Sequence, residues 1–360
     1  MRSTTALLTA LSVLRLAAAA VLMDKGALDD SNKTLHARAW QAKDSAAEFE
    51  IFSQYSAAAY CDDLFDGFDR TPVCSNPYDG ACPNFKGTTT VKEFLNDDFY
   101  GVGGFIASNP TRRHTVVVFK GTSSIFDVHT DVSKGLTPCD LCDGCLVHSG
   151  FYAALNRLRP QLVRAVLAER RKPRRDDYRL VVTGHSLGGA LATLAAVHLR
   201  NLGIPCDVYT YGAPRVGNDR LAAHIASSRH FTARITNARD IVAAVPNYGW
   251  LWYWRSYAHH YPEYWYPGGL DGGTRRYGLP RRVCWGDGQC SSAVCNSPWQ
   301  WVTWRGCSLP DHLNYYGRFQ PCGNGDRGSR NPVGMLRQAK SGPMSRSHLP
   351  DPQSIARWLQ

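Results

Sequence analysis

A serine between two glycines marks the most informative segment of this chain. Residues 181–190 read VVTGHSLGGA, so Gly184 and Gly188 stand two positions before and after Ser186. The apolar β-type run before the serine and the Ala/Leu-rich run after it indicate a strand that turns abruptly into a helix. Such a turn strains the central residue and leaves no room for side chains two positions away. A chance Gly-Ser-Gly turn would lack this context, so we interpret Ser186 as a nucleophile at the edge of a sheet, where helix N–H groups face developing negative charge.

A serine hydroxyl becomes reactive only when a histidine takes its proton and a carboxylate stabilises the resulting imidazolium. In the α/β-hydrolases, whose nucleophile turn has this pattern, the carboxylate and then the histidine follow the serine along the chain. Asp240 comes at the exit of a predicted strand and is flanked by apolar residues. Residue order alone leaves other candidates open. They are the carboxylates Asp219, Glu263, Asp271 and Asp287, and the histidines His259, His260 and His312.

Alternating strand and helix patterns must position these side chains. Buried strands are predicted at 113–121, 178–183, 206–211 and 231–236. Helical spacing of apolar residues predicts helices within 40–60, at 151–171 and at 187–202. This alternation predicts an α/β fold in one domain, with a mostly parallel central sheet and helices on both faces.

The two ends of the chain differ from its centre. Residues 1–20 combine a positive start, an apolar run and small residues, which predicts a secretory signal peptide and an extracellular location. Residues 21–39 are predicted to be a leader or a processed segment, and 40–322 the catalytic domain. Residues 323–360 are basic, rich in Gly, Pro and Ser, and predicted to be a disordered tail. No segment after the signal is an apolar run of membrane-spanning length.

Charge and cysteine content narrow the class further. The formal net charge is +11, but the basic residues are scattered and no nucleic-acid motif accompanies them, so no nucleic-acid partner is expected. The 12 cysteines suit an oxidising compartment. Cys139, Cys142 and Cys145 lack a second ligand pair at zinc spacing, so a disulfide is preferred to a metal site, and Cys284 with Cys290 is a plausible pair. We expect no metal, no cofactor and no obligate protein partner.

Several motifs, taken in order, resemble the fungal class 3 triacylglycerol lipases, which are secreted α/β-hydrolases. The resemblance runs from about residue 49 to residue 322. It is carried by QYSAAAYC at 54–61, VFKGT at 118–122, HSGF at 148–151, TGHSLGGALA at 183–192, YGAPRVGN at 211–218, RIT at 234–236 with DIV at 240–242, His259 with PEYW at 262–265, and His312 with YYG at 315–317.

The resemblance implies roles for individual residues. Ser186 becomes the nucleophile, Asp240 the carboxylate and His312 the base. The oxyanion hole is expected to use the Leu187 N–H together with the N–H and hydroxyl of Thr122. His259 and His185 match family positions outside the triad, and structural hydrogen bonds are their expected role.

The resemblance also implies disulfides that join Cys61 with Cys322, Cys74 with Cys82, and Cys142 with Cys145. The sequence does not pair the remaining Cys139, Cys206, Cys295 and Cys307.

Two segments depart from the family pattern. The segment matching the lid helix, 123–132, has Val128 about where a tryptophan is common, which leaves interfacial activation open. An inserted run, YGWLWYW at 248–254, is interpreted with equal weight as an aromatic core plug or as an anchor for a lipid–water interface.

The sequence therefore predicts a secreted carboxylester hydrolase that acts through an acyl-enzyme intermediate, with a triacylglycerol lipase as the main expectation. A feruloyl-type esterase acting on plant cell-wall esters is the first alternative, although the apolar lid segment and the tryptophan run argue against it. A non-catalytic lipid-binding protein on the same scaffold is the second, and the complete Ser-Asp-His set argues against that.

Overall fold

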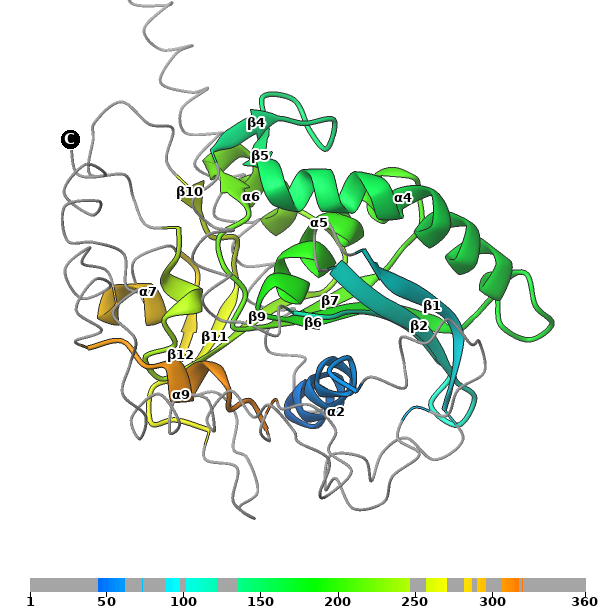
Figure 1. The fold of residues 1–360 in the computed structure, drawn as a ribbon, viewed down its shortest axis with the longest axis horizontal. Helices are drawn as coiled ribbons and strands as arrows, with labels where there is room; N and C mark the ends of the chain where they lie inside the picture. Colours follow the sequence, from blue (N-terminus) through cyan, green and yellow to red (C-terminus); the bar gives the residue numbers. More distant parts are fainter. Residues whose placement is uncertain are drawn as a thin grey trace, which may run out of the picture.

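A computed structural model describes residues 45–61, 73, 88–97, 102–121, 135–246, 257–270, 282–286, 290–295, 306–316 and 319 (Figure 1). The predicted signal peptide, leader and tail lie outside these residues. So do Thr122, the lid segment 123–132 and the aromatic run 248–254. Within the residues that the structure describes, no helix combines the length and apolar character that crossing a bilayer requires.

One large sheet organises the described part of the chain. Its eight strands run in the order β1-β2-β3-β6-β7-β9-β11-β12. The bounds are β1 Thr89–Asp97, β2 Val102–Asn109, β3 His114–Phe119, β6 Arg179–His185, β7 Asp207–Tyr211, β9 Thr232–Asn237, β11 Glu263–Tyr266 and β12 Arg282–Cys284. The centre of the sheet is parallel and consists of β3, β6, β7, β9 and β11. The edge strands pair antiparallel: β1 with β2, β2 with β3, and β12 with β11. The predicted parallel centre is confirmed, but the parallel strand β11 and the edge strands β1, β2 and β12 were not predicted.

Helices cover both faces of this sheet, as predicted. Helices α4 (Ser149–Arg170), α5 (Leu187–Asn201) and α6 (Asp219–Ala226) lie on one face, and α2 (Ser45–Ala58) lies on the other (Figure 1). Side chains alternate between the two faces along each strand. Val117 and Val182 therefore pack with α4 and α5, while Val116 and Val181 pack with α2. Burial on both faces explains why these strands are almost continuous apolar runs.

A second, smaller sheet and three short helical segments complete the described elements. Strands β4 (Leu136–Pro138), β5 (Leu146–His148), β8 (Gly217–Asn218) and β10 (Tyr257–Ala258) are ordered β10-β8-β5-β4. The 3₁₀ turn η2 spans Val242–Ala244, and the short helices are α7 (Ser291–Val294) and α9 (Leu309–His312). These elements have two to four residues each, too few for a periodic pattern, and the sequence analysis did not predict them.

Three disulfides are present among the described cysteines. Cys142–Cys145 and Cys284–Cys290 confirm two predicted pairs, with Cα–Cα distances of 5.3 and 6.1 Å. Cys295–Cys307 joins two cysteines that the sequence had left unassigned.

The remaining cysteines fall into two groups. Cys61 is disulfide-bonded, but its predicted partner Cys322 lies outside the described residues, as do Cys74 and Cys82. Cys139 and Cys206 are free thiols.

Candidate active site

The turn between β6 and α5 holds Ser186 in a strained backbone, with φ 58° and ψ −130°. A Cβ atom at Gly184 would overlap the backbone of Gly188, and a Cβ at Gly188 would overlap the carbonyl of Phe119 and lie 2.8 Å from the carbonyl carbon of Lys120. Close backbone contacts therefore require glycine at both positions, which explains the G-x-S-x-G pattern in the sequence.

Ser186 lies immediately before the first turn of α5, and the residue is 2% exposed. Its Oγ has no hydrogen-bond partner among the described residues. Leu187 is the first residue of α5, where backbone N–H groups have no acceptor within the helix. Gly121, which precedes the predicted oxyanion residue Thr122, packs beside the serine, since a Cβ built on it would lie 3.2 Å from Ser186 Cβ. Thr122 itself is outside the described residues.

Asp240 and His312 form a buried hydrogen-bonded pair. His312 Nδ1 lies 2.9 Å from Asp240 Oδ1 and 3.0 Å from Oδ2, and each residue is 1% exposed. A carboxylate only accepts hydrogen bonds, so His312 Nδ1 carries the ring proton. His312 Nε2 therefore has a free lone pair and can accept a proton. Asp240 lies in the turn after β9, and His312 lies in α9, 72 residues later in the sequence. An isolated β-bridge between Asp240 and Ser308 joins these two segments.

Three further donors fix the Asp240 carboxylate. The N–H groups of Val242 and Ala243 donate to Oδ1 at 2.8 and 3.4 Å, and the Tyr315 hydroxyl donates to Oδ2 at 2.5 Å. Burial and the adjacent Asp240 raise the pKa of Tyr315 well above its usual value, so its phenol stays protonated as a donor. Tyr315 had no predicted role, and its position three residues after His312 was the available signal in the sequence.

The serine and the Asp–His pair meet at the carboxyl ends of β6, β7 and β9, which are adjacent strands. The Ser186 N–H donates to the carbonyl of Tyr211 at the end of β7. Gly212, with φ 55°, allows the chain to pass closely, because a Cβ there would overlap Asp240 Oδ2 and lie 2.9 Å from His312 Nδ1. All three predicted triad residues therefore lie at one sheet edge, where ligands bind in open α/β sheets.

The other candidate carboxylates that the structure describes lie elsewhere. Asp219 is exposed at the start of α6. Glu263 is buried and accepts from Arg234 at 2.7 Å, Thr236 at 2.5 Å and Ser291. The Glu263 carboxylate therefore accepts its hydrogen bonds from Arg234, Thr236 and Ser291, away from His312. Asp271 and Asp287 are outside the described residues.

The other histidines also have structural surroundings. His259 Nε2 donates to the Ala243 carbonyl at 2.7 Å, which is the kind of hydrogen bond expected for it. His260 is buried beside Arg234, and burial together with that guanidinium lowers the pKa of His260 to about 3. Neither ring is among the groups that hold the Asp240 carboxylate.

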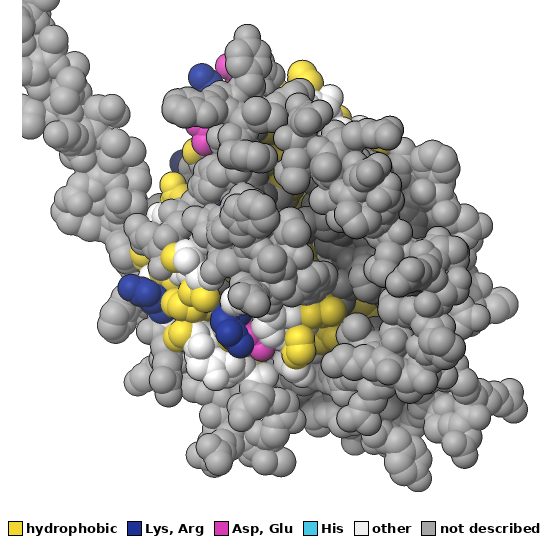
Figure 2. All heavy atoms as spheres, turned by 60° about the vertical axis from the view of Figure 1, so that its left-hand side comes forward, with side chains coloured by type: hydrophobic (Ala, Val, Ile, Leu, Met, Phe, Trp, Pro, Cys, Tyr) yellow, Lys and Arg dark blue, Asp and Glu magenta, His cyan; other side chains and the backbone are white. Residues whose placement is uncertain are grey.

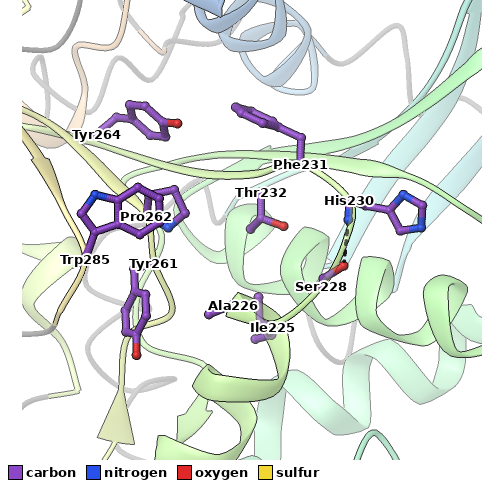
Figure 3. Close-up of a pocket in the computed structure, with 10 residues that line it drawn as sticks. All are labelled: Ile225, Ala226, Ser228, His230, Phe231, Thr232, Tyr261, Pro262, Tyr264 and Trp285. Carbon is purple, nitrogen blue, oxygen red and sulfur yellow. Dashed lines mark hydrogen bonds between the residues drawn. The ribbon is translucent and has the colours of Figure 1, made fainter. Parts of the chain in front are cut away.

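A pocket lies at the opposite end of β9 from Asp240. Aromatic and apolar side chains surround it, among them Phe231, Tyr261, Pro262, Tyr264 and Trp285 (Figure 3). Figure 2 brings the left-hand side of Figure 1 forward and shows hydrophobic side chains of described residues at the surface beside basic ones. Because the pocket adjoins the start of β9, it is separate from the edge that carries Ser186, Asp240 and His312.

Comparisons with known proteins agree with this geometry. The family model "Lipase (class 3)" matches residues 116–250. The chain is 34% identical over 317 residues to "Secreted mono- and diacylglycerol lipase 1" of Fusarium solani, covering 87% of this chain and 88% of that protein. It is 35% identical over 226 residues to "Secreted mono- and diacylglycerol lipase A" of Penicillium cyclopium, covering 61% of this chain and 69% of that one.

Solved structures show the same relationship. The crystal structure of a mono- and diacylglycerol lipase from Aspergillus oryzae superposes with a TM-score of 0.63 at 28% identity, over 76% of this chain and 97% of that one. The chain therefore belongs to the class 3 lipase family and is a lipase, a serine carboxylester hydrolase with the α/β-hydrolase fold.

Proposed function

We propose that this lipase hydrolyses acylglycerols with Ser186 as nucleophile, His312 as general base and Asp240 as the supporting carboxylate. The observation that carries the proposal is the buried Asp240–His312 pair at the sheet edge that also presents the strained Ser186 turn. The pair holds His312 in the tautomer whose Nε2 accepts the serine proton.

The reaction proceeds in two halves. Ser186 Oγ attacks the ester carbonyl while its proton passes to His312 Nε2, and the tetrahedral oxyanion is stabilised by the Leu187 N–H and by Thr122. His312 then protonates the leaving alcohol, which leaves an acyl group on Ser186. A water molecule attacks this ester with the same base, and the fatty acid departs. Loss of one oxyanion donor costs about 3–4 kcal/mol in enzymes of this type.

Partial glycerides are the proposed preferred substrates. Two relatives, 34% and 35% identical to this chain over the aligned residues, are named mono- and diacylglycerol lipases. The sequence motifs favour a triacylglycerol lipase instead, and the two substrate classes differ in whether the site accommodates a third acyl chain. Feruloyl esters remain the alternative substrate class.

Secretion and interfacial adsorption belong to the same proposal. Disulfides among the described cysteines and relatives named as secreted support an extracellular enzyme. We place the signal peptide at 1–20, the leader at 21–39, the catalytic domain at 40–322 and the tail at 323–360. For the aromatic run 248–254, which lies outside the described residues, an interfacial anchor and an aromatic core plug are proposed with equal weight.

The test compares substrates on one purified preparation. Rates are measured on monoolein, diolein and triolein emulsions, on p-nitrophenyl butyrate and on methyl ferulate. Hydrolysis of the oleoyl glycerides, fastest for the partial glycerides, supports the proposal, and a preference for triolein or methyl ferulate contradicts its substrate class. Ser186→Ala should abolish every activity, whereas Ser227→Ala, at an exposed helix end, should change none. Activity remaining in Ser186→Ala would refute the mechanism.

A further inference from the structure

His185, which precedes the nucleophile, contacts the backbone of His312 rather than its imidazole nitrogens. Its Nε2 lies 2.8 Å from the His312 carbonyl oxygen, and its Nδ1 lies 2.7 Å from the Tyr60 hydroxyl. The residue is 2% exposed; its ring stacks on the Phe319 ring, with 4.0 Å between ring centroids, and packs at a tilt against the His312 ring, with 4.5 Å between centroids. The triad chemistry makes no use of this buried imidazole.

The direction of each hydrogen bond follows from donor and acceptor chemistry. A carbonyl oxygen only accepts, so His185 Nε2 carries the ring proton and donates to His312. In a neutral imidazole Nδ1 is then an acceptor, and Tyr60 must donate to it. The Tyr60 oxygen in turn accepts from the Gly121 N–H. The order is therefore Gly121 N–H to Tyr60, Tyr60 O–H to His185, and His185 N–H to the His312 carbonyl.

This order requires His185 to stay neutral. Burial, and then the adjacent His312, lower the pKa of His185 well below its usual value. The titratable side chains whose rings or hydroxyls lie against it are Tyr60, His312 and Tyr315, and none is an anion at neutral pH. A protonated ring would present two donors and lose the hydrogen bond from Tyr60.

The hydrogen-bonded series connects the three segments that assemble the site. Gly121 follows β3 and packs against the serine turn, since a Cβ on it would overlap Tyr60 Oη and lie 2.7 Å from the His185 carbonyl oxygen. His185 is the last residue of β6 and Ser186 follows it. His312 is the last residue of α9. The His185 imidazole bonds directly to the His312 carbonyl and reaches Gly121 through the Tyr60 hydroxyl.

We propose that His185 is a positioning residue, which sets the His312 backbone relative to Ser186 through its hydrogen bond, while Tyr60 selects its tautomer. The inference rests on the proposed triad. Because His185 touches neither substrate nor the transferred proton, its loss should change the rate of the chemical step and leave ester binding largely intact. A base displaced by about 1 Å from its productive position typically costs about 100-fold in rate.

The experiment measures kcat and KM on p-nitrophenyl butyrate, thermal midpoints, and the rate of phosphorylation of the serine by diethyl p-nitrophenyl phosphate. His185→Phe keeps a ring against Phe319 but removes both hydrogen bonds. His185→Gln has an amide donor and acceptor close together and a similar volume. His114→Phe is the matched control, because His114 also packs against an aromatic ring, that of Phe52, but at the start of β3.

We expect kcat and the phosphorylation rate of His185→Phe to fall about 100-fold with KM within about threefold, and His185→Gln to recover to within about tenfold of wild type. Tyr60→Phe should fall between them, and His114→Phe should keep wild-type kcat. Wild-type kcat in His185→Phe, or no advantage of Gln over Phe, overturns the inference. Should His185→Phe fail to fold, Tyr60→Phe and His185→Gln decide it, since wild-type kcat in Tyr60→Phe also overturns it.

Failure of the proposed function gives a different result. Ser186→Ala and His312→Ala are assayed in parallel, and activity remaining in either one refutes the triad itself. The soluble butyrate ester makes the outcome independent of whether mono-, di- or triacylglycerols are preferred.

Discussion

Tyr315→Phe removes one oxygen atom from the site and tests how firmly Asp240 must be held. In the wild type this hydroxyl donates to Asp240 Oδ2 at 2.5 Å and accepts from the Asn237 N–H at 3.0 Å. The tyrosine is 1% exposed, so water does not replace either hydrogen bond. Asp240 would keep its hydrogen bonds from Val242 and His312, whereas the Asn237 N–H would lose its acceptor at this position.

The expected magnitudes follow from these two losses. A hydrogen bond to a charged group contributes about 1.5–3 kcal/mol, and a buried donor without a partner costs about 1–3 kcal/mol. Together they predict that the free energy of unfolding falls by about 2.5–6 kcal/mol. If the carboxylate loses about 1.5–3 kcal/mol of its support in the transition state, kcat falls about 10- to 100-fold. This is well short of the roughly 10⁴-fold loss expected for Asp240→Asn.

The assay combines kcat on p-nitrophenyl butyrate with urea unfolding of the same preparations. Tyr152→Phe is a matched control, because Tyr152 donates to Asp140 at 2.8 Å and accepts from the Asp140 N–H at 3.1 Å on an exposed surface. Water can replace both of those bonds, so this variant should match the wild type in both measurements. Unchanged kcat in Tyr315→Phe, or an equal loss in Tyr152→Phe, would show that buried support of the carboxylate does not matter.

Three further predictions concern other parts of the chain. His312→Ala should remove nearly all esterase activity while His259→Ala leaves the chemical step largely intact, and the opposite ranking on p-nitrophenyl butyrate would refute the triad assignment. Thiol labelling of the native protein should modify the partly exposed Cys139 and spare Cys206, which is buried, until the protein is denatured; labelling unaffected by Cys139→Ser would contradict this. Burial is the main cause that lowers the pKa of His260 to about 3 in the folded protein. The unfolded state therefore binds more protons below about pH 6.5. The free energy of unfolding should decrease as the pH falls from about 6.5 towards 3. His260→Gln should show a shallower decrease in urea titrations across this range, and an unchanged slope would rule out this source of acid sensitivity.

Features that leave a local mark in the sequence, such as a required glycine or a run of apolar residues, could be predicted from the sequence alone. The Ser186 turn was predictable because Gly184 and Gly188 are required by backbone contacts within a few residues of it or with the adjacent strand. The parallel sheet was predictable because strands buried on both faces are continuous apolar runs, and the helices between them have an apolar face. Family motifs then singled out Asp240 and His312 from several candidates that residue order had left equal.

Only the tertiary structure decided which distant side chains meet. Tyr315 reaches Asp240 across 75 residues and Tyr60 reaches His185 across 125, and no local pattern records either contact. The Cys295–Cys307 disulfide was likewise undetermined, because spacing does not fix the pairing of several cysteines. Local geometry is limited by sterics over a few residues, whereas these contacts depend on how whole strands and helices pack. That packing brings the buried Tyr315 hydroxyl to the Asp240 carboxylate and the neutral His185 imidazole to the His312 carbonyl.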